Sequence, residues 1–107
     1  MYTPTGIRLT TNREPSLSMR FHLVGIGGAG MSALARWLRH KGATVSGSDL
    51  TESPTLHALR QMGADAYAAH DATRIGQPDW VVVSDAIHPD NPEVIEAMRR
   101  EIPIWRR

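Results

Sequence analysis

Cysteine is absent from the 107-residue sequence, and lysine occurs only once, at Lys41. Without cysteine the chain can form no disulfide, no thiolate metal site and no cysteine nucleophile. The 12 Lys and Arg residues nearly balance the 11 Asp and Glu residues, so no net field draws the chain to nucleic acid or to an anionic membrane. No apolar run approaches the roughly 20 residues that span a bilayer. We therefore expect a cytoplasmic protein with neither nucleic acid nor membrane as a partner.

The composition differs between the start of the chain and the remainder. Residues 1–18 are rich in Thr, Pro, Ser and Arg and lack the apolar core of a signal peptide. We expect residues 1–18 to form a flexible leader and residues 19–107 to form one domain. Apolar residues make up 41% of the sequence and charged residues 21%, which is ordinary for a globular protein.

Apolar runs alternate with helical periods from Arg20 onward. This alternation predicts an α/β domain with a Rossmann-like parallel sheet of about five strands, flanked by helices. The predicted strands are residues 20–25, 43–48, 65–68, 79–84 and 102–105. The fifth strand is expected at an edge of the sheet, because Pro103 cannot donate to a ladder of hydrogen bonds.

Three helices are predicted between these strands. Gly42 ends the first helix, and the pairs Ser53-Pro54 and Asn91-Pro92 provide a cap and a first helical residue for the other two. The side chains expected to face inward are Met31, Leu34, Ala35 and Leu38, then Leu56, Leu59 and Met62, then Val94, Ile95 and Met98. Trp37, Trp80 and Trp105 are interpreted as packing residues rather than as platforms for a base.

A glycine-rich turn separates the first strand from the first helix. Residues 25–30 (GIGGAG) fit G-x-G-x-x-G in the context that the motif requires, with a strand before it and a helix after it. Gly25 would permit the tight turn, Gly27 the approach of a pyrophosphate, and Gly30 the close packing of helix on strand. Because free N–H groups at a helix start favour anions, the turn predicts a site for the diphosphate of a nucleotide-linked ligand. A glycine-rich turn without a ligand is the alternative.

Asp49 lies at the predicted end of the second strand. Dinucleotide-binding folds place a carboxylate there against a ribose hydroxyl. Ser48 and Asp49 are also common turn residues, so an ordinary turn is the alternative. Up to this point a nicotinamide dinucleotide, FAD and a UDP-sugar fit equally well.

Residues 19–107 resemble the first domain of the Mur ligases, which build the peptide of the bacterial cell wall. Six stretches carry the resemblance: 22–32 (HLVGIGGAGMS), 45–49 (VSGSD), 70–71 (HD), 81–87 (VVVSDAI), 91–93 (NPE) and 102–107 (IPIWRR). The members that add L-alanine fit better than the tripeptide-adding recycling members, which generally lack the Ser-x-Ala-Ile form of the fourth stretch. Asp85 departs from the family, where a small serine is common, and we expect it to face away from the ligand.

In the Mur ligases this domain binds the UDP part of UDP-N-acetylmuramate. The resemblance implies that residues 27–32 hold the diphosphate, that Asp49 meets the uridine, and that His70 and the loop 84–87 line the same cleft. His70 and Ser84 also have ordinary interpretations, as a surface or core histidine and as a turn residue at a strand end. The full predicted set of substrate-binding residues is Gly25, Gly27, Gly28, Ala29, Gly30, Met31, Ser32, Ser48, Asp49, His70, Ser84, Ala86 and Ile87.

Catalytic groups are missing from the sequence. It contains no G-x-x-x-x-G-K-[ST] loop, no cluster of residues at metal-ligand spacing and no pair of nucleophile and base. We therefore expect no catalytic residue, metal ligand or cofactor in this domain. The resemblance implies a full-length ligase that uses ATP and Mg²⁺ and whose ATP-binding and C-terminal domains are absent here. An NAD(H)-binding regulatory or redox module and an interaction domain without a ligand are the alternatives.

Overall fold

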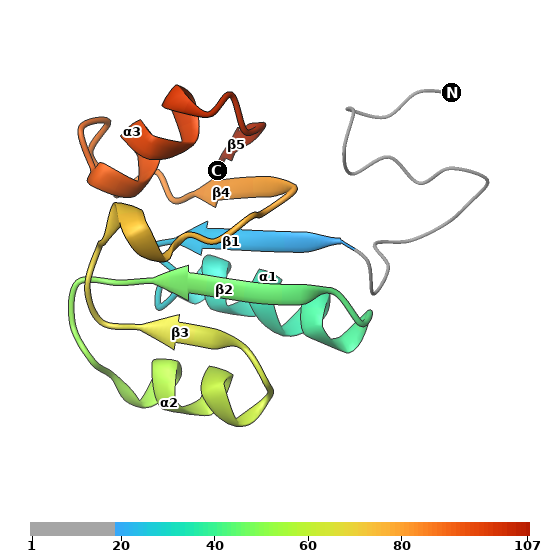
Figure 1. The fold of residues 1–107 in the computed structure, drawn as a ribbon. Helices are drawn as coiled ribbons and strands as arrows, with labels where there is room; N and C mark the ends of the chain where they lie inside the picture. Colours follow the sequence, from blue (N-terminus) through green and yellow to red (C-terminus); the bar gives the residue numbers. More distant parts are fainter. Residues whose placement is uncertain (1–18) are drawn as a thin grey trace.

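The computed structural model describes residues 19–107 (Figure 1), and the leader predicted at residues 1–18 lies outside this range. The five strands are β1 (Arg20–Val24), β2 (Thr44–Ser48), β3 (Asp65–Tyr67), β4 (Trp80–Val83) and β5 (Ile104–Arg106). The helices are α1 (Ala29–His40), α2 (Pro54–Gln61) and α3 (Pro92–Arg99), with a short 3₁₀ helix η2 (Ala72–Arg74). No helix within residues 19–107 is long and apolar enough to cross a membrane.

All strand pairs are parallel, and the sheet order is β3-β2-β1-β4-β5. The predicted Rossmann-like α/β class is confirmed, with β5 at an edge as expected. The chain runs outward from β1 to β3, then returns to the other side of β1 to form β4. An open α/β sheet binds its ligand at such a reversal, beyond the carboxyl ends of the strands. These ends lie at the arrowheads in Figure 1, where the loops after β1 and β4 are neighbours.

The helices begin and end where local chemistry dictates. The Ser53 side chain accepts a hydrogen bond from the N–H of Leu56, and the Asn91 side chain accepts one from the N–H of Glu93. In both helices a proline occupies the first turn, as predicted. Gly42 follows α1 with a φ of +93°, a left-handed conformation that glycine adopts at little cost.

The two faces of the sheet are covered differently. Helices α1 and α2 cover one face, where Phe21, Leu23 and Val82 pack against residues such as Leu38 and Leu59. Helix α3 covers the other face with a smaller apolar cluster of Val24, Val81, Val83, Val94 and Ala97. Side chains alternate along each strand, so His22 and Val24 face α3 while Phe21 and Leu23 face α1 and α2.

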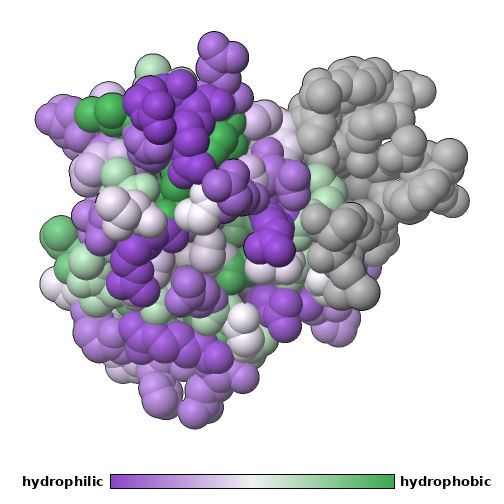
Figure 2. Space-filling model, viewed as in Figure 1, coloured by the Kyte–Doolittle hydropathy of each residue, from purple (hydrophilic) through white to green (hydrophobic). Residues whose placement is uncertain are grey.

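Some side-chain predictions were wrong. Ile95 and Met98 on α3 are 50% and 63% exposed, and Met62 just after α2 is 39% exposed. Val94 is buried as predicted, but its buried companions in α3 are Glu93 and Ala97, because the face that α3 buries includes the Glu93 carboxylate as well as apolar side chains. Hydrophobic patches over α3 are visible in Figure 2.

The tryptophans also divide between the core and the surface. Trp80 lies in the core, as predicted for a packing residue, with 8% of its surface exposed. Trp37 and Trp105 are 47% and 39% exposed, so packing describes them only in part.

Candidate functional site

A cleft of about 320 Å³ opens where the loops after β1, β2 and β4 meet. It is lined by Gly25, Gly27, Gly28, Asp49, Thr51, Ser53, Ser84, Ala86 and Ile87. The glycine turn, the end of β2 and the loop after β4 are far apart in sequence, and the fold brings them together. Thr51 and Ser53 were not predicted at the site, because Ser53 was interpreted only as a helix cap.

Three backbone donors at the start of α1 have no protein acceptor in residues 19–107. Within the described residues the N–H groups of Ala29, Gly30 and Met31 donate to no protein atom, and Gly28 at the N-cap offers no side-chain cap. The first turn of α1 contains no acidic residue. Three free N–H groups at the positive end of a 12-residue helix suit an anion such as a phosphate.

The Asp49 carboxylate is bonded to the glycine turn. Its Oδ2 accepts a hydrogen bond from the N–H of Gly27 at 2.6 Å, and its Oδ1 accepts one from the N–H of Leu50 at 2.7 Å. The carboxylate therefore takes the place of an anion at Gly27. Each of its oxygens keeps a lone pair, so the group can still accept from a ligand hydroxyl.

The loop after β4 forms a compact turn against Gly25. The N–H of Ile87 donates to the carbonyl of Ser84, and the N–H of Ala86 donates to the Ser84 hydroxyl. Gly25 has a φ of +89°, and a Cβ there would lie 3.0 Å from the Cβ of Ser84. Glycine is therefore required at residue 25 both by its backbone conformation and by the neighbouring loop.

A second cleft of about 290 Å³ adjoins the first at the start of α1. Its lining consists of Gly28, Ala29, Gly30, Met31, Ser84, Asp85 and Arg107. Asp85, which we expect to face away from the ligand, is one of the residues that line this second cleft. Its carboxylate would repel a bound phosphate, whereas the Arg107 guanidinium would attract one.

Gly30 does not have the role predicted from the motif. A Cβ at Gly30 would meet no atom within 4 Å, so no close packing of helix on strand requires glycine there. The position faces the open second cleft instead. Close packing requires glycine at Gly47, where a Cβ would lie 2.5 Å from the carbonyl oxygen of Leu23.

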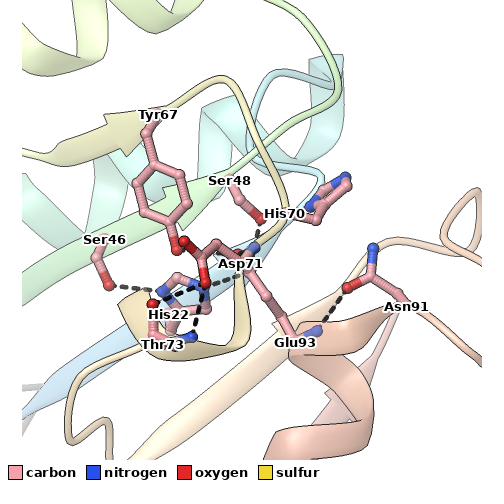
Figure 3. A network of polar contacts seen from close by, with 9 residues as sticks. All are labelled: His22, Ser46, Ser48, Tyr67, His70, Asp71, Thr73, Asn91 and Glu93. Carbon is pink, nitrogen blue, oxygen red and sulfur yellow. Dashed lines mark hydrogen bonds and ion pairs between the residues drawn. The ribbon is translucent and has the colours of Figure 1, made fainter.

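A buried polar network lies beneath the carboxyl ends of β1, β2 and β3 (Figure 3). The Glu93 carboxylate at its centre is fully buried. Its Oε1 accepts from His22 Nε2 at 2.7 Å and from the Ser48 hydroxyl at 2.7 Å. Its Oε2 accepts from the Tyr67 hydroxyl at 2.9 Å and from the N–H of Asp71 at 2.8 Å. One carboxylate on α3 thus joins three strands and the loop before η2.

The ionisation of this network follows from these hydrogen bonds. Burial alone would raise the pKa of Glu93, but hydrogen bonds from His22, Ser48 and the N–H of Asp71 outweigh it and hold the pKa below its ordinary value. Burial, followed by the negative charge of Glu93, raises the pKa of Tyr67. Glu93 is therefore ionised and Tyr67 is a neutral donor at neutral pH.

Three of the predicted substrate-binding residues line neither cleft. Ser32 is buried, and its hydroxyl donates to the carbonyl of Ala29. Ser48 is fully buried within the network of Glu93. His70 is half-buried beside Ser48, with its Nδ1 2.8 Å from the Ser48 hydroxyl oxygen. The other ten predicted residues line one cleft or both.

Glu93 and His22 were not predicted as members of a site. An acidic residue in the first turn of a helix normally pairs with the helix dipole in solvent. Polar residues at alternate positions, at His22 and at Ser46 and Ser48, were the available signal for a polar face. Only the register, which places His22 beside Ser46 and Ser48 beside Tyr67, turns that signal into a cluster.

The remaining described residues add no second candidate site. A hollow of about 210 Å³ at the opposite end of the sheet, lined by Arg20, Thr44 and Gly76 among others, contains none of the predicted residues. Within residues 19–107 no three His, Asp or Glu side chains are grouped as metal ligands would be.

Comparison with known proteins identifies relatives of the whole described region. A family model described as "Mur ligase family, catalytic domain" matches residues 20–107. The UDP-N-acetylmuramate–L-alanine ligase of Nocardioides sp. is 51% identical over 88 residues, which is 82% of this chain and 20% of that protein. The ligase of the same name from Mycobacterium avium is 48% identical over 104 residues, 92% of this chain and 21% of that protein. The chain therefore spans about a fifth of the length of these relatives.

Solved structures of similar proteins have the same fold. A UDP-N-acetylmuramate-alanine ligase from Thermotoga maritima superimposes with a TM-score of 0.80 at 38% identity, covering 83% of this chain and 21% of that one. A UDP-N-acetylmuramate:L-alanyl-gamma-D-glutamyl-meso-diaminopimelate ligase from Neisseria superimposes with a TM-score of 0.75 at 26% identity, covering 82% of this chain and 28% of that one.

Proposed function

This chain belongs to the Mur ligase family, and from that premise we propose that residues 19–107 hold the UDP part of UDP-N-acetylmuramate for ATP-dependent attachment of L-alanine. The named relatives favour the alanine-adding branch, because the alanine ligase of Thermotoga is 38% identical and the tripeptide-adding ligase of Neisseria 26%. This function places the domain in peptidoglycan synthesis, in the cytoplasm.

The observation that carries the proposal is the meeting of two loops at the reversal of the sheet. The free N–H groups at the start of α1 and the Ser84-Asp85-Ala86-Ile87 turn form adjoining clefts there. A diphosphate on the N–H groups of Ala29, Gly30 and Met31 would gain hydrogen bonds and the favourable end of the helix dipole. The nucleoside would then extend over Asp49, toward the end of β2.

The ligation chemistry would belong to the remainder of the parent protein. Ligases of this family use ATP and Mg²⁺, and residues 19–107 offer neither a phosphate loop with lysine nor a group of metal ligands. The role of this domain is therefore to bind and orient. Holding the nucleotide end of the substrate presents its distant carboxylate to groups outside this domain.

Ligand identity tests the proposal directly. UDP and UDP-N-acetylmuramate should shift the amide resonances of Gly28, Ala29 and Gly30 in the ¹⁵N-labelled chain, whereas NADH should not. Binding should be weak, because contacts from the missing domains are absent. Saturation by NADH at micromolar concentration, with no response to UDP, would replace the ligase function with that of a redox or regulatory module.

The role of Asp49 needs a test that separates ligand contact from its bond to Gly27. The wild-type chain should bind UDP more tightly than 2′-deoxy-UDP by about 1.5–3 kcal/mol, the range for a hydrogen bond to a charged group. Asp49→Ala disturbs the turn equally for both ligands and should abolish that preference. If the preference survives in Asp49→Ala, the carboxylate belongs to the turn alone.

A further inference from the structure

The Glu93 carboxylate already accepts as many hydrogen bonds as its two oxygens allow. A carboxylate offers about four lone-pair directions. Here two donors meet each oxygen: His22 and Ser48 at Oε1, Tyr67 and the N–H of Asp71 at Oε2. The fully buried, ionised group is thus saturated. Each of the four partners must therefore donate a hydrogen bond to Glu93.

This saturation determines where the Ser48 proton goes. A serine hydroxyl has one hydrogen, and a bond to a carboxylate is roughly twice as strong as a bond between neutral groups. If Ser48 turned its hydrogen toward His70, two lone pairs would face each other across 2.7 Å at Glu93 Oε1. The Ser48 oxygen is therefore an acceptor toward His70 Nδ1, 2.8 Å away, and Nδ1 must carry a hydrogen.

We propose that Glu93, acting through the Ser48 hydroxyl, is a positioning residue that holds His70 in its Nδ1–H form and leaves Nε2 as a hydrogen-bond acceptor for the ligand. Within residues 19–107, His70 Nε2 bonds to no protein atom. The ring lies on the outer side of Ser48, away from the Glu93 carboxylate (Figure 3). An acceptor at this edge selects a ligand that presents a donor, such as an imide N–H or a hydroxyl of uridine.

The same carboxylate imposes the opposite form on His22. His22 Nε2 must donate to Glu93, so in the neutral ring Nδ1 accepts from the Ser46 hydroxyl at 2.7 Å. Two histidines in one network are thereby held as opposite tautomers. This contrast provides an internal reference, because both rings can be observed in one sample.

The position of His70 connects the network to the proposed ligand. The N–H of Asp49 donates to the carbonyl of Tyr67, so the ends of β2 and β3 lie side by side. A nucleoside that extends from the glycine turn over Asp49 would next reach His70. The choice of uridine donor as the ligand group rests on the proposed function, whereas the tautomer of His70 does not.

Long-range ¹H–¹⁵N spectra of the histidine rings test the tautomer in the full chain without ligand, at a pH where the rings are neutral. His70, assigned through His70→Gln, should show a protonated Nδ1 and an unprotonated Nε2, and His22 should show the reverse. A proton on His70 Nε2 in the wild-type chain would overturn the proposal. The tautomer is read from the wild-type chain, and His70→Gln serves only to assign the resonances.

Two matched variants separate positioning from general loosening of the network. Ser48→Ala removes the acceptor of His70, so its resonances should move toward the Nε2–H form that free histidine prefers. Tyr67→Phe removes a donor from the other oxygen of Glu93 and should leave His70 unchanged. An equal change in both variants would show that His70 merely responds to loosening and would contradict the relay through Ser48.

Addition of UDP tests the ligand half of the proposal. UDP should move the His70 Nε2 resonance in the direction of an accepted hydrogen bond, while Nδ1 stays protonated. If the glycine amides shift and His70 Nε2 does not, the acceptor role is wrong and the proposed function stands. If the glycine amides do not respond to UDP, the proposed function is wrong, and the spectrum of the free chain still decides the tautomer.

Discussion

The two faces of this sheet bury different kinds of side chain. Toward α1 and α2 the strands present only apolar side chains, which pack into one continuous core. Toward α3 an apolar cluster covers the end of β1, β4 and β5, whereas His22 of β1, Ser48 of β2 and Tyr67 of β3 form the polar network of Glu93. Within residues 19–107 the apolar face buries no charged side chain, whereas the other face is organised around the buried Glu93 carboxylate.

This division has a functional meaning. Apolar packing is non-directional, so it makes the sheet stable without specifying the orientation of any group at its edge. A saturated hydrogen-bond network is directional and determines where each proton lies. The network extends from α3 through Ser48, the residue before Asp49, to His70 at the carboxyl edge. We therefore expect changes in the network to reach the ligand and changes in the apolar core to affect stability alone.

The largest effect is expected from Glu93→Ala. This change leaves His22, Ser48 and Tyr67 without their common acceptor in a buried site, and should lower the free energy of unfolding by about 3–5 kcal/mol. It should also alter the His70 resonances. Urea denaturation measures the loss. Glu96→Ala, which removes ion pairs at the surface of the same helix, is the control and should cost much less than Glu93→Ala. Equal losses of unfolding free energy in the two variants would mean that the buried network stabilises the fold no more than a surface ion pair does.

Leu59→Ala breaks the apolar face instead. Leu59 is fully buried on α2, and its truncation should lower the free energy of unfolding by about 2–4 kcal/mol through lost burial and a residual cavity. The folded fraction should bind UDP as the wild-type chain does. A large change in UDP affinity, measured under conditions where the variant is folded, would contradict the separation of the two faces.

Lowering the pH should weaken the face that contains Glu93 and not the apolar face, with a smaller effect on stability than either substitution above. The pKa of Glu93 is lower in the folded chain than its ordinary value of about 4.5, so its contribution is present above that pH. The contribution is lost as the pH falls through the lower folded value. Stability of the wild-type chain and of Leu59→Ala should therefore decline in parallel on acidification. Glu93→Gln should decline less steeply, and an unchanged slope in denaturation curves would exclude Glu93 as a source of acid sensitivity.

The smallest expected change in stability comes from Gly30→Ala, where α1 opens onto the second cleft. A Cβ meets no neighbour at this helical position, so alanine should stabilise the chain by about 0.5–1 kcal/mol. The same methyl group would occupy the space proposed for the diphosphate and should weaken UDP binding. Thermal unfolding and a UDP titration of one sample measure both effects. Unchanged UDP affinity would move the diphosphate away from Gly30.

Much of the fold could be predicted because its signals are local. The alternation of apolar runs and helical periods predicted the class and the order of the elements. The pairs Ser53-Pro54 and Asn91-Pro92 predicted two helix starts that the structure confirms. The glycine turn predicted the strand–turn–helix unit, because a left-handed glycine and free helical N–H groups follow from a few neighbouring residues.

The predictions that depended on depth in the fold were less successful. Ile95 and Met98 were assigned to the core by periodicity, and Glu93 was treated only as the opening of a helix. A helical period cannot show that one carboxylate will be the better buried residue, because its partners come from three strands. The same applies to Gly30 and Gly47, since the close approach of another backbone is invisible in the motif.

The sequence by itself determined that this chain is a parallel α/β domain with a glycine-rich turn between its first strand and first helix, because propensities, caps and glycine spacing act over a few residues. Tertiary structure alone decided which groups meet. The register of β1, β2 and β3 brings His22, Ser48 and Tyr67 around Glu93, and the reversal of the sheet brings Ser84 to the glycine turn. Hydrogen bonds require atoms within about 3 Å of one another, and over long sequence separations only the folded chain supplies that proximity.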